Sequence, residues 1–140
     1  MRRSIGFFSV TAVLSALSCE LGPVDPSQRR ERIEYRGSGK VLDAQTGLPV
    51  RDVRVLVDDK WATTKGDGTY ETDTSWYGCR VVERDCEVAA RAILDAPLYG
   101  IADASATILV RDWKKADKPR IRFPDIKATS CASAPAQVGC

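Results

Sequence analysis

Three segments in the first half of the chain decide its fold: GKVLDAQTGLPV at residues 39–50, VRVLV at 53–57 and TTKGDGTY at 63–70. Apolar and polar side chains alternate within and around them, which predicts short strands with one buried face. The GDG sequence at 66–68 is typical of a hairpin turn, because glycine tolerates the positive φ that such turns require. We therefore expect strands joined by tight turns and an all-β fold.

The same alternation extends through the centre of the chain and predicts seven strands. They are residues 33–41, 53–57, 61–64, 69–73, 88–94, 104–110 and 120–123. The alanine-rich run at 88–94 is also compatible with a helical turn, but Val88 and Ile93 favour a strand because β-branched side chains fit a pleated surface. A loop is expected over residues 96–102, with a helix within 95–105 as the alternative.

The three opening segments occur in the order and spacing of a known motif. Gly-x-Val-x-Asp-x-x-Thr-Gly-x-Pro-Val, a Val-x-Val strand and Thr-Thr-x-x-Asp-Gly-x-Tyr resemble the carboxypeptidase regulatory-like domain, over residues 33–73. The resemblance implies a seven-stranded antiparallel β-sandwich, transthyretin-like and immunoglobulin-like in type, over residues 32–126. Domains of that family accompany peptidases, precede outer-membrane receptors or stand alone in exported proteins, and they are usually not catalytic. The resemblance therefore implies no active site in this chain.

Residues 1–18 have the form of a secretory signal peptide. A positive head at residues 1–3 precedes an uncharged, largely apolar run from Ile5 to Leu17. This run is shorter than the roughly 20 residues that a transmembrane helix needs. The sequence ALSC at 16–19 resembles the lipobox of bacterial lipoproteins, although alanine stands where that family prefers leucine. The resemblance implies a lipid anchor on Cys19 that holds the protein at a membrane; the alternative is secretion after ordinary cleavage.

Segments of different composition flank the predicted sandwich. Residues 19–31 contain prolines and charged side chains without apolar periodicity, which is typical of a linker, here a lipid-anchored one. Residues 127–140 are rich in alanine, serine, proline and glycine and are predicted to form a cysteine-containing coil tail.

The chain contains five cysteines, an odd number for an exported protein. Assigning Cys19 to lipid leaves four. These are Cys79, Cys86, Cys131 and Cys140. They can pair in three ways, of which the two local pairs are the simplest, and an oxidising location favours disulfides. The first pair frames residues 80–85, which we expect to form a disulfide-linked hairpin; a four-cysteine metal site is disfavoured because no Cys-x-x-Cys pair occurs.

Charge and composition narrow the function. Arg2 and Arg3 account for the formal net charge of +2, so the predicted mature chain is neutral and has no basic excess for binding nucleic acid. The chain has no histidine, which removes the commonest general base and the commonest zinc ligand. It also lacks the Gly-x-Ser-x-Gly motif of serine hydrolases. We therefore expect no enzyme activity, no cofactor, no metal site and no nucleic-acid partner.

Aromatic side chains are the candidate ligand contacts. We expect them in loops and at strand ends, where they can anchor a protein partner or stack on a sugar. The candidates are Trp76, Tyr77, Tyr99 and Trp113, with Trp61 as a further aromatic at a predicted strand end. The alternative is that they close the ends of the hydrophobic core.

A calcium site is a weaker alternative. Asp58, Asp59, Asp67 and Asp73 surround two predicted turns, and calcium prefers several carboxylate and carbonyl oxygens. Aspartate is also common in turns for conformational reasons, and no Asp-x-Asp-x-Asp loop is present.

The sequence therefore predicts an exported, lipid-anchored, non-enzymatic β-sandwich that binds a partner or acts as a scaffold at the bacterial cell envelope. A carbohydrate-binding module is the first alternative. A peptidase-associated accessory domain or inhibitor is the second. Residues 75–87 and the loops around Tyr99 and Trp113 are the expected contact regions.

Overall fold

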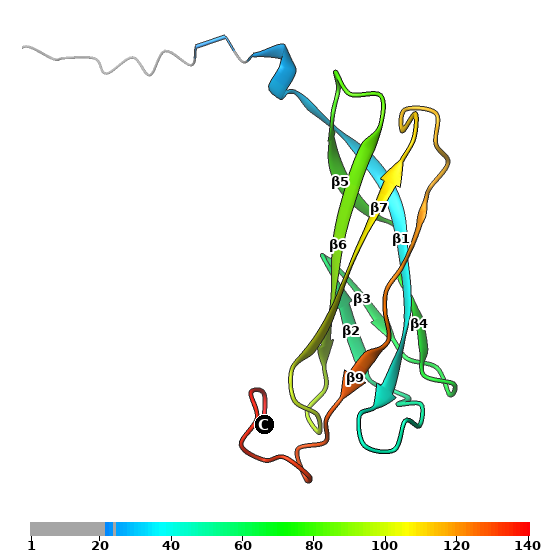
Figure 1. Ribbon diagram of the computed structural model, residues 1–140, viewed down its shortest axis with the longest axis vertical. Helices are drawn as coiled ribbons and strands as arrows, with labels where there is room; N and C mark the ends of the chain where they lie inside the picture. Colours follow the sequence, from blue (N-terminus) through cyan, green and yellow to red (C-terminus); the bar gives the residue numbers. More distant parts are fainter. Residues whose placement is uncertain (1–21, 24) are drawn as a thin grey trace, which may run out of the picture.

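The computed structural model describes residues 22, 23 and 25–140, so the predicted signal peptide and Cys19 lie outside the described residues. Nine strands and one short 3-10 helix occur in the described part of the chain (Figure 1). In order they are η1 (Pro26–Gln28), β1 (Arg30–Asp43), β2 (Arg54–Val57), β3 (Lys60–Thr63), β4 (Thr69–Glu71), β5 (Ser75–Arg80), β6 (Cys86–Asp95), β7 (Ala102–Val110), β8 (Arg120–Arg122) and β9 (Ile126–Ala128).

The strands form two sheets that pack face to face, so the predicted all-β sandwich is confirmed. In the first sheet β1 pairs antiparallel with β4 and β5 and parallel with β8 and β9. The second sheet has the order β3-β2-β6-β7 and is antiparallel throughout. The structure differs from the expectation of seven antiparallel strands through the additional strands β5 and β9 and the two parallel pairings.

The core lies between the two sheets and is filled by alternate side chains of the strands. On β1 the side chains of Ile33, Tyr35 and Val41 point inward and are buried, while Arg32 and Glu34 are exposed. Strand β6 shows the same alternation along its whole length, which confirms the predicted strand at 88–94. The helix considered within 95–105 is absent: the chain turns after β6 and enters β7 at Ala102.

A hydrogen bond crosses the sandwich between the two sheets. The hydroxyl of Tyr35, on β1, donates to a carboxylate oxygen of Asp58, in the turn between β2 and β3. The other oxygen of that carboxylate accepts from the backbone N–H of Arg91 at 3.3 Å. Burial, and then the neighbouring Asp58, raise the pKa of Tyr35 above the ordinary tyrosine value. Asp58 thus provides a hydrogen-bond partner for the Tyr35 hydroxyl, which would otherwise be unpaired inside the core.

The disulfide between Cys79 and Cys86 joins the two sheets. Cys79 is on β5 in the first sheet and Cys86 begins β6 in the second, and both are buried. The local pairing predicted from sequence is confirmed, but the expected hairpin over 80–85 is wrong. The two strands that flank this segment pair with different neighbours, β5 with β1 and β6 with β2 and β7, so the segment is a connection between sheets.

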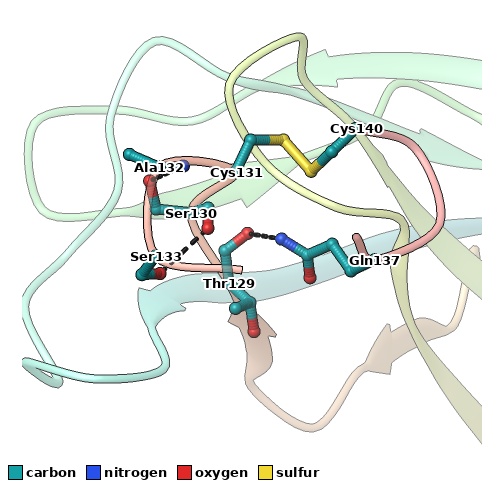
Figure 2. The surroundings of a disulfide bond; sticks show 7 residues. All are labelled: Thr129, Ser130, Cys131, Ala132, Ser133, Gln137 and Cys140. Carbon is teal, nitrogen blue, oxygen red and sulfur yellow. Dashed lines mark hydrogen bonds between the residues drawn. A yellow bond between two sulfur atoms is a disulfide. The ribbon is translucent and has the colours of Figure 1, made fainter. Parts of the chain in front are cut away.

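The second predicted disulfide, Cys131–Cys140, closes the C-terminal tail against the loop after β6 (Figure 2). The side chain of Gln137, which lies within the ring that this disulfide closes, donates at 2.8 Å to the carbonyl of Thr129, which precedes the ring. Backbone hydrogen bonds tie the tail to the loop, from Gly100 to Thr129 at 3.0 Å and from Ile101 to Val138 at 2.9 Å. The tail is therefore fixed at both ends, and β9 extends across the predicted boundary between residues 126 and 127.

The linker and the tail lie at opposite ends of the elongated sandwich (Figure 1). The predicted linker ends earlier than expected, because β1 already begins at Arg30, where it faces Arg80 at the end of β5. Helix η1 lies in this linker and is capped by the side chain of Asp25. No helix among the described residues is long and apolar enough to cross a membrane.

Gly39 is required by the close approach of Tyr70. The two residues are opposite each other in the β1–β4 pairing, and the buried Tyr70 ring lies across β1 at Gly39. A Cβ atom on Gly39 would lie 2.6 Å from the ring carbon Cζ. Because this ring is enclosed by the core, it has little room to move aside.

We expect Gly39→Ala to lower the free energy of unfolding by about 2 kcal/mol through overpacking. Gly66→Ala is the matched control, because a Cβ there meets no atom within 4 Å, and its effect should stay within about 0.5 kcal/mol. Urea unfolding of both variants measures the difference. Equal stability of the two variants would contradict the close approach of Tyr70.

The two disulfides should contribute unequally to the free energy of unfolding. The loops they close are similar in length, with sequence separations of 7 and 9, so the chain-entropy model gives each about 2.5 kcal/mol. Replacing Cys79 and Cys86 by alanine also empties part of the core, whereas the Cys131–Cys140 pair is at the surface. We therefore expect the Cys79/Cys86 double variant to lose more free energy of unfolding, measured in urea, than the Cys131/Cys140 double variant. An equal or smaller loss would contradict the role of the Cys79–Cys86 disulfide between the sheets.

Candidate ligand-contact surface

Trp76 lies on the outer face of the first sheet, not in a loop as predicted. It is on β5 opposite Glu34 of β1, and 45% of the residue is exposed. The guanidinium carbon of Arg32 lies 3.3 Å from the centre of its ring. A cation–π contact at an exposed site contributes about 0.5–1 kcal/mol, which is enough to favour one orientation of the indole. The ring is thus held in place on a sheet, where a partner can reach it.

A second arginine–tryptophan pair lies on the other sheet. Trp61 of β3 is 46% exposed, and the guanidinium of Arg54 lies 4.0 Å from the centre of its ring. The pair is formed across the β2–β3 ladder, two residues from Leu56, which is the direct partner of Trp61. The two pairs have nearly the same exposure and chemistry but different surroundings, which makes Trp61 a suitable control for Trp76.

The other aromatic candidates pack in or against the hydrophobic core and do not cluster around Trp76. Tyr77 is half-buried and contacts the core, because neighbouring residues of a strand point to opposite faces. Tyr99 is half-buried in the loop after β6, at the end that carries the tail, and forms a bridge with Ser130. Trp113 is only 5% exposed, and its ring N–H donates to the carbonyl of Glu83 at 2.9 Å. Trp113 therefore packs at the rim of the core.

A groove lies beside β1, on the edge away from β5. It has a volume of about 470 Å³ and runs between residues 31–34 of β1 and residues 113–118, the segment that leads to β8. Its lining includes the apolar side chains of Ile33, Trp113 and Ala116, and an ion pair between Lys118 and Glu34 at 2.9 Å spans it. This groove is not predicted from the sequence. Its signal is the charged run KKADKP at 114–119, which interrupts the path between two strands.

A smaller cavity of about 360 Å³ lies at the middle of the same sheet, between β4 and β8. Basic side chains surround it, among them Lys40 and Arg120, and Arg120 pairs with Glu71 at 3.1 Å. The hydroxyl of Tyr70 lies next to it without a hydrogen-bond partner, and burial raises the pKa of this tyrosine. Because the hydroxyl oxygen itself is enclosed, it is not positioned to contact a molecule in this cavity.

Two of the four turn aspartates already accept hydrogen bonds from other residues. Asp58 is engaged by Tyr35, while Asp67 accepts hydrogen bonds from the hydroxyl of Thr69 at 2.6 Å and from its N–H at 3.0 Å. These bonds lower the pKa of Asp67 below the ordinary aspartate value. Within residues 22, 23 and 25–140, no three or more side chains of histidine, cysteine, aspartate or glutamate are grouped to hold a metal ion. The conformational explanation accounts for Asp67, while Asp58 links its turn to Tyr35 and Arg91.

Comparisons of the sequence with protein-family models, with curated proteins and with solved structures find no match.

Proposed function

We propose that the protein is an exported, lipid-anchored, non-enzymatic β-sandwich that acts as a binding or scaffolding module at the bacterial cell envelope. The observation that carries this proposal is the Arg32–Trp76 pair: an exposed indole is held on the outer face of the first sheet, and Arg32 also lines the groove on the other edge of β1. Tryptophan and arginine are the residues most often found at the energetic centre of protein interfaces. The likeness of residues 33–73 to the carboxypeptidase regulatory-like domain belongs to the same proposal.

The location at the envelope rests on the two disulfides and on the amino-terminal sequence. Disulfides form and persist in oxidising compartments outside the cytoplasm. The charged head, the apolar run and Cys19 favour export followed by lipid attachment. The described part of the linker joins the sandwich at the end opposite the tail (Figure 1), so an anchor on Cys19 would connect to that end of the sandwich.

A carbohydrate-binding module is the second candidate, because an exposed indole on a sheet is also a stacking surface for a sugar ring. The position of Arg32 argues against it, since the guanidinium already covers one face of the Trp76 ring at 3.3 Å. A peptidase-associated role follows only from the family resemblance and stays a prediction.

The contact surface is tested with Trp76→Ala against Trp61→Ala. The tagged protein and each variant are used to recover partners from solubilised envelope, and the recovered protein is quantified. We expect Trp76→Ala to reduce recovery by at least about tenfold, as loss of an interface hot spot does, and Trp61→Ala to leave it unchanged. Equal recovery of partners by both variants contradicts the assignment of Trp76 as a partner contact. Binding to a glycan panel that is abolished by Trp76→Ala would favour the carbohydrate alternative instead.

The anchor is tested by labelling cells with radioactive palmitate. The wild-type protein should incorporate label and fractionate with membranes, and Cys19→Ser should abolish both. The Cys131→Ser/Cys140→Ser double variant is the control, because it removes two cysteines but retains Cys19. Unchanged labelling of Cys19→Ser would refute the lipid anchor.

A further inference from the structure

Strand β1 has partners on both edges along only part of its length. From Arg36 onward it pairs with β4 on one edge and with β8 and β9 on the other. From Arg30 to Tyr35 it pairs with β5 alone. The chain that leads to β8 reaches β1 at Pro119, whose carbonyl accepts from the N–H of Arg36 at 3.0 Å. The first part of β1 is therefore an open sheet edge.

The hydrogen bonds along β1 show which backbone groups face this open edge. Arg29 and Gly37, in odd positions, bond to residues that flank β5. Arg36 and Ser38, in even positions, bond on the side of β8. Backbone groups alternate between the two edges of a strand, so the N–H and C=O groups of Arg32 and Glu34 point toward the missing partner. No hydrogen bond to these backbone groups is found within the described part of the chain.

The groove described above lies at this same edge. On the inner side it is lined by Ile33, Trp113 and Ala116, and on the outer side by charged side chains of both signs. Among these, Glu34 is already paired with Lys118, and Arg32 covers the Trp76 ring. The groove thus combines unpaired backbone donors and acceptors with an apolar floor and a rim of balanced charge.

We propose that an extended peptide segment of a partner protein binds in this groove and adds a strand to β1 at Arg32 and Glu34. The regular alternation of donors and acceptors along a strand edge matches the backbone of another strand, and added strands of this kind are a common mode of peptide recognition. Alternate side chains of the peptide would face Ile33, Trp113 and Ala116, so apolar residues are expected at every second position. This proposal rests on the proposed function as a binding module, and it specifies the binding site and the class of ligand.

The two edges of the second sheet are less suitable for an added strand. Strand β3 has four residues and carries an exposed tryptophan together with Lys60. The long strand β7, at the edge of the second sheet, lies close to β8 and β9 of the first sheet, which restricts access to its free side. The open part of β1 is the edge that borders the groove.

The test begins with a displayed library of random ten-residue peptides selected on the purified protein. A selected peptide is then titrated, and amide hydrogen exchange is measured with and without it. We expect peptides with apolar residues at alternate positions, and new protection of the amides of Arg32 and Glu34. Ala116→Arg, which fills the floor of the groove, should weaken binding by at least about tenfold. Ala89→Arg, an exposed position on β6, is the matched control and should bind within about twofold of the wild type.

Three results would overturn the strand-addition proposal. One is that no peptide is enriched over a parallel selection on an unrelated β-sandwich protein. Another is that a selected peptide protects only amides other than those of Arg32 and Glu34. The third is equal affinity of Ala116→Arg and Ala89→Arg, provided that thermal unfolding shows both to be folded. Peptides that protect another surface would remove the β1 site while leaving the binding role intact. Loss of the binding role would instead appear as failure of envelope recovery by the wild-type protein.

Discussion

The fold depends on the backbone pairing of one strand. Four other strands of the first sheet hydrogen-bond to β1 (Arg30–Asp43) and to no other strand of that sheet. A strand buried in a sandwich must pair its N–H and C=O groups, because each unpaired buried group costs about 1–3 kcal/mol. β4 and β5 satisfy one edge, and β8 and β9 satisfy most of the other. The remaining stretch, at Arg32 and Glu34, lies at the surface, where the groove leaves it accessible.

The other stabilising features act where the two sheets meet. Gly39 admits the Tyr70 ring across β1, and Tyr35 reaches the turn between β2 and β3. The Cys79–Cys86 disulfide joins the sheets at the end where the linker attaches, and the second disulfide fixes the tail at the other end. The first disulfide covalently links the two sheets beside the surface formed by β1 and β5, whereas the second restrains only the tail.

The sequence predicted the all-β class, most of the strands and both cysteine pairings, because alternation of apolar residues and short cysteine spacings are local signals. It did not predict β5, since Ser75–Arg80 mixes aromatic, glycine and cysteine residues without clear alternation. Nor did it predict the parallel pairing of β8 and β9, which depends on where a distant segment meets β1. Trp76 was identified as a candidate, but the groove on the other edge of β1 was not. It exists because residues 113–118 diverge from β1, a consequence of tertiary packing.

Amide hydrogen exchange along β1 in the unliganded protein tests the central claim most directly. The account predicts strong protection at Ile33, Tyr35 and Arg36, whose N–H groups face paired strands or Pro119, and rapid exchange at Arg32 and Glu34. Protection of Arg32 and Glu34 as strong as that of Ile33 and Tyr35 would contradict it. That result would mean that β1 already has a partner on both edges along its whole length, and that no open edge is present to receive a strand.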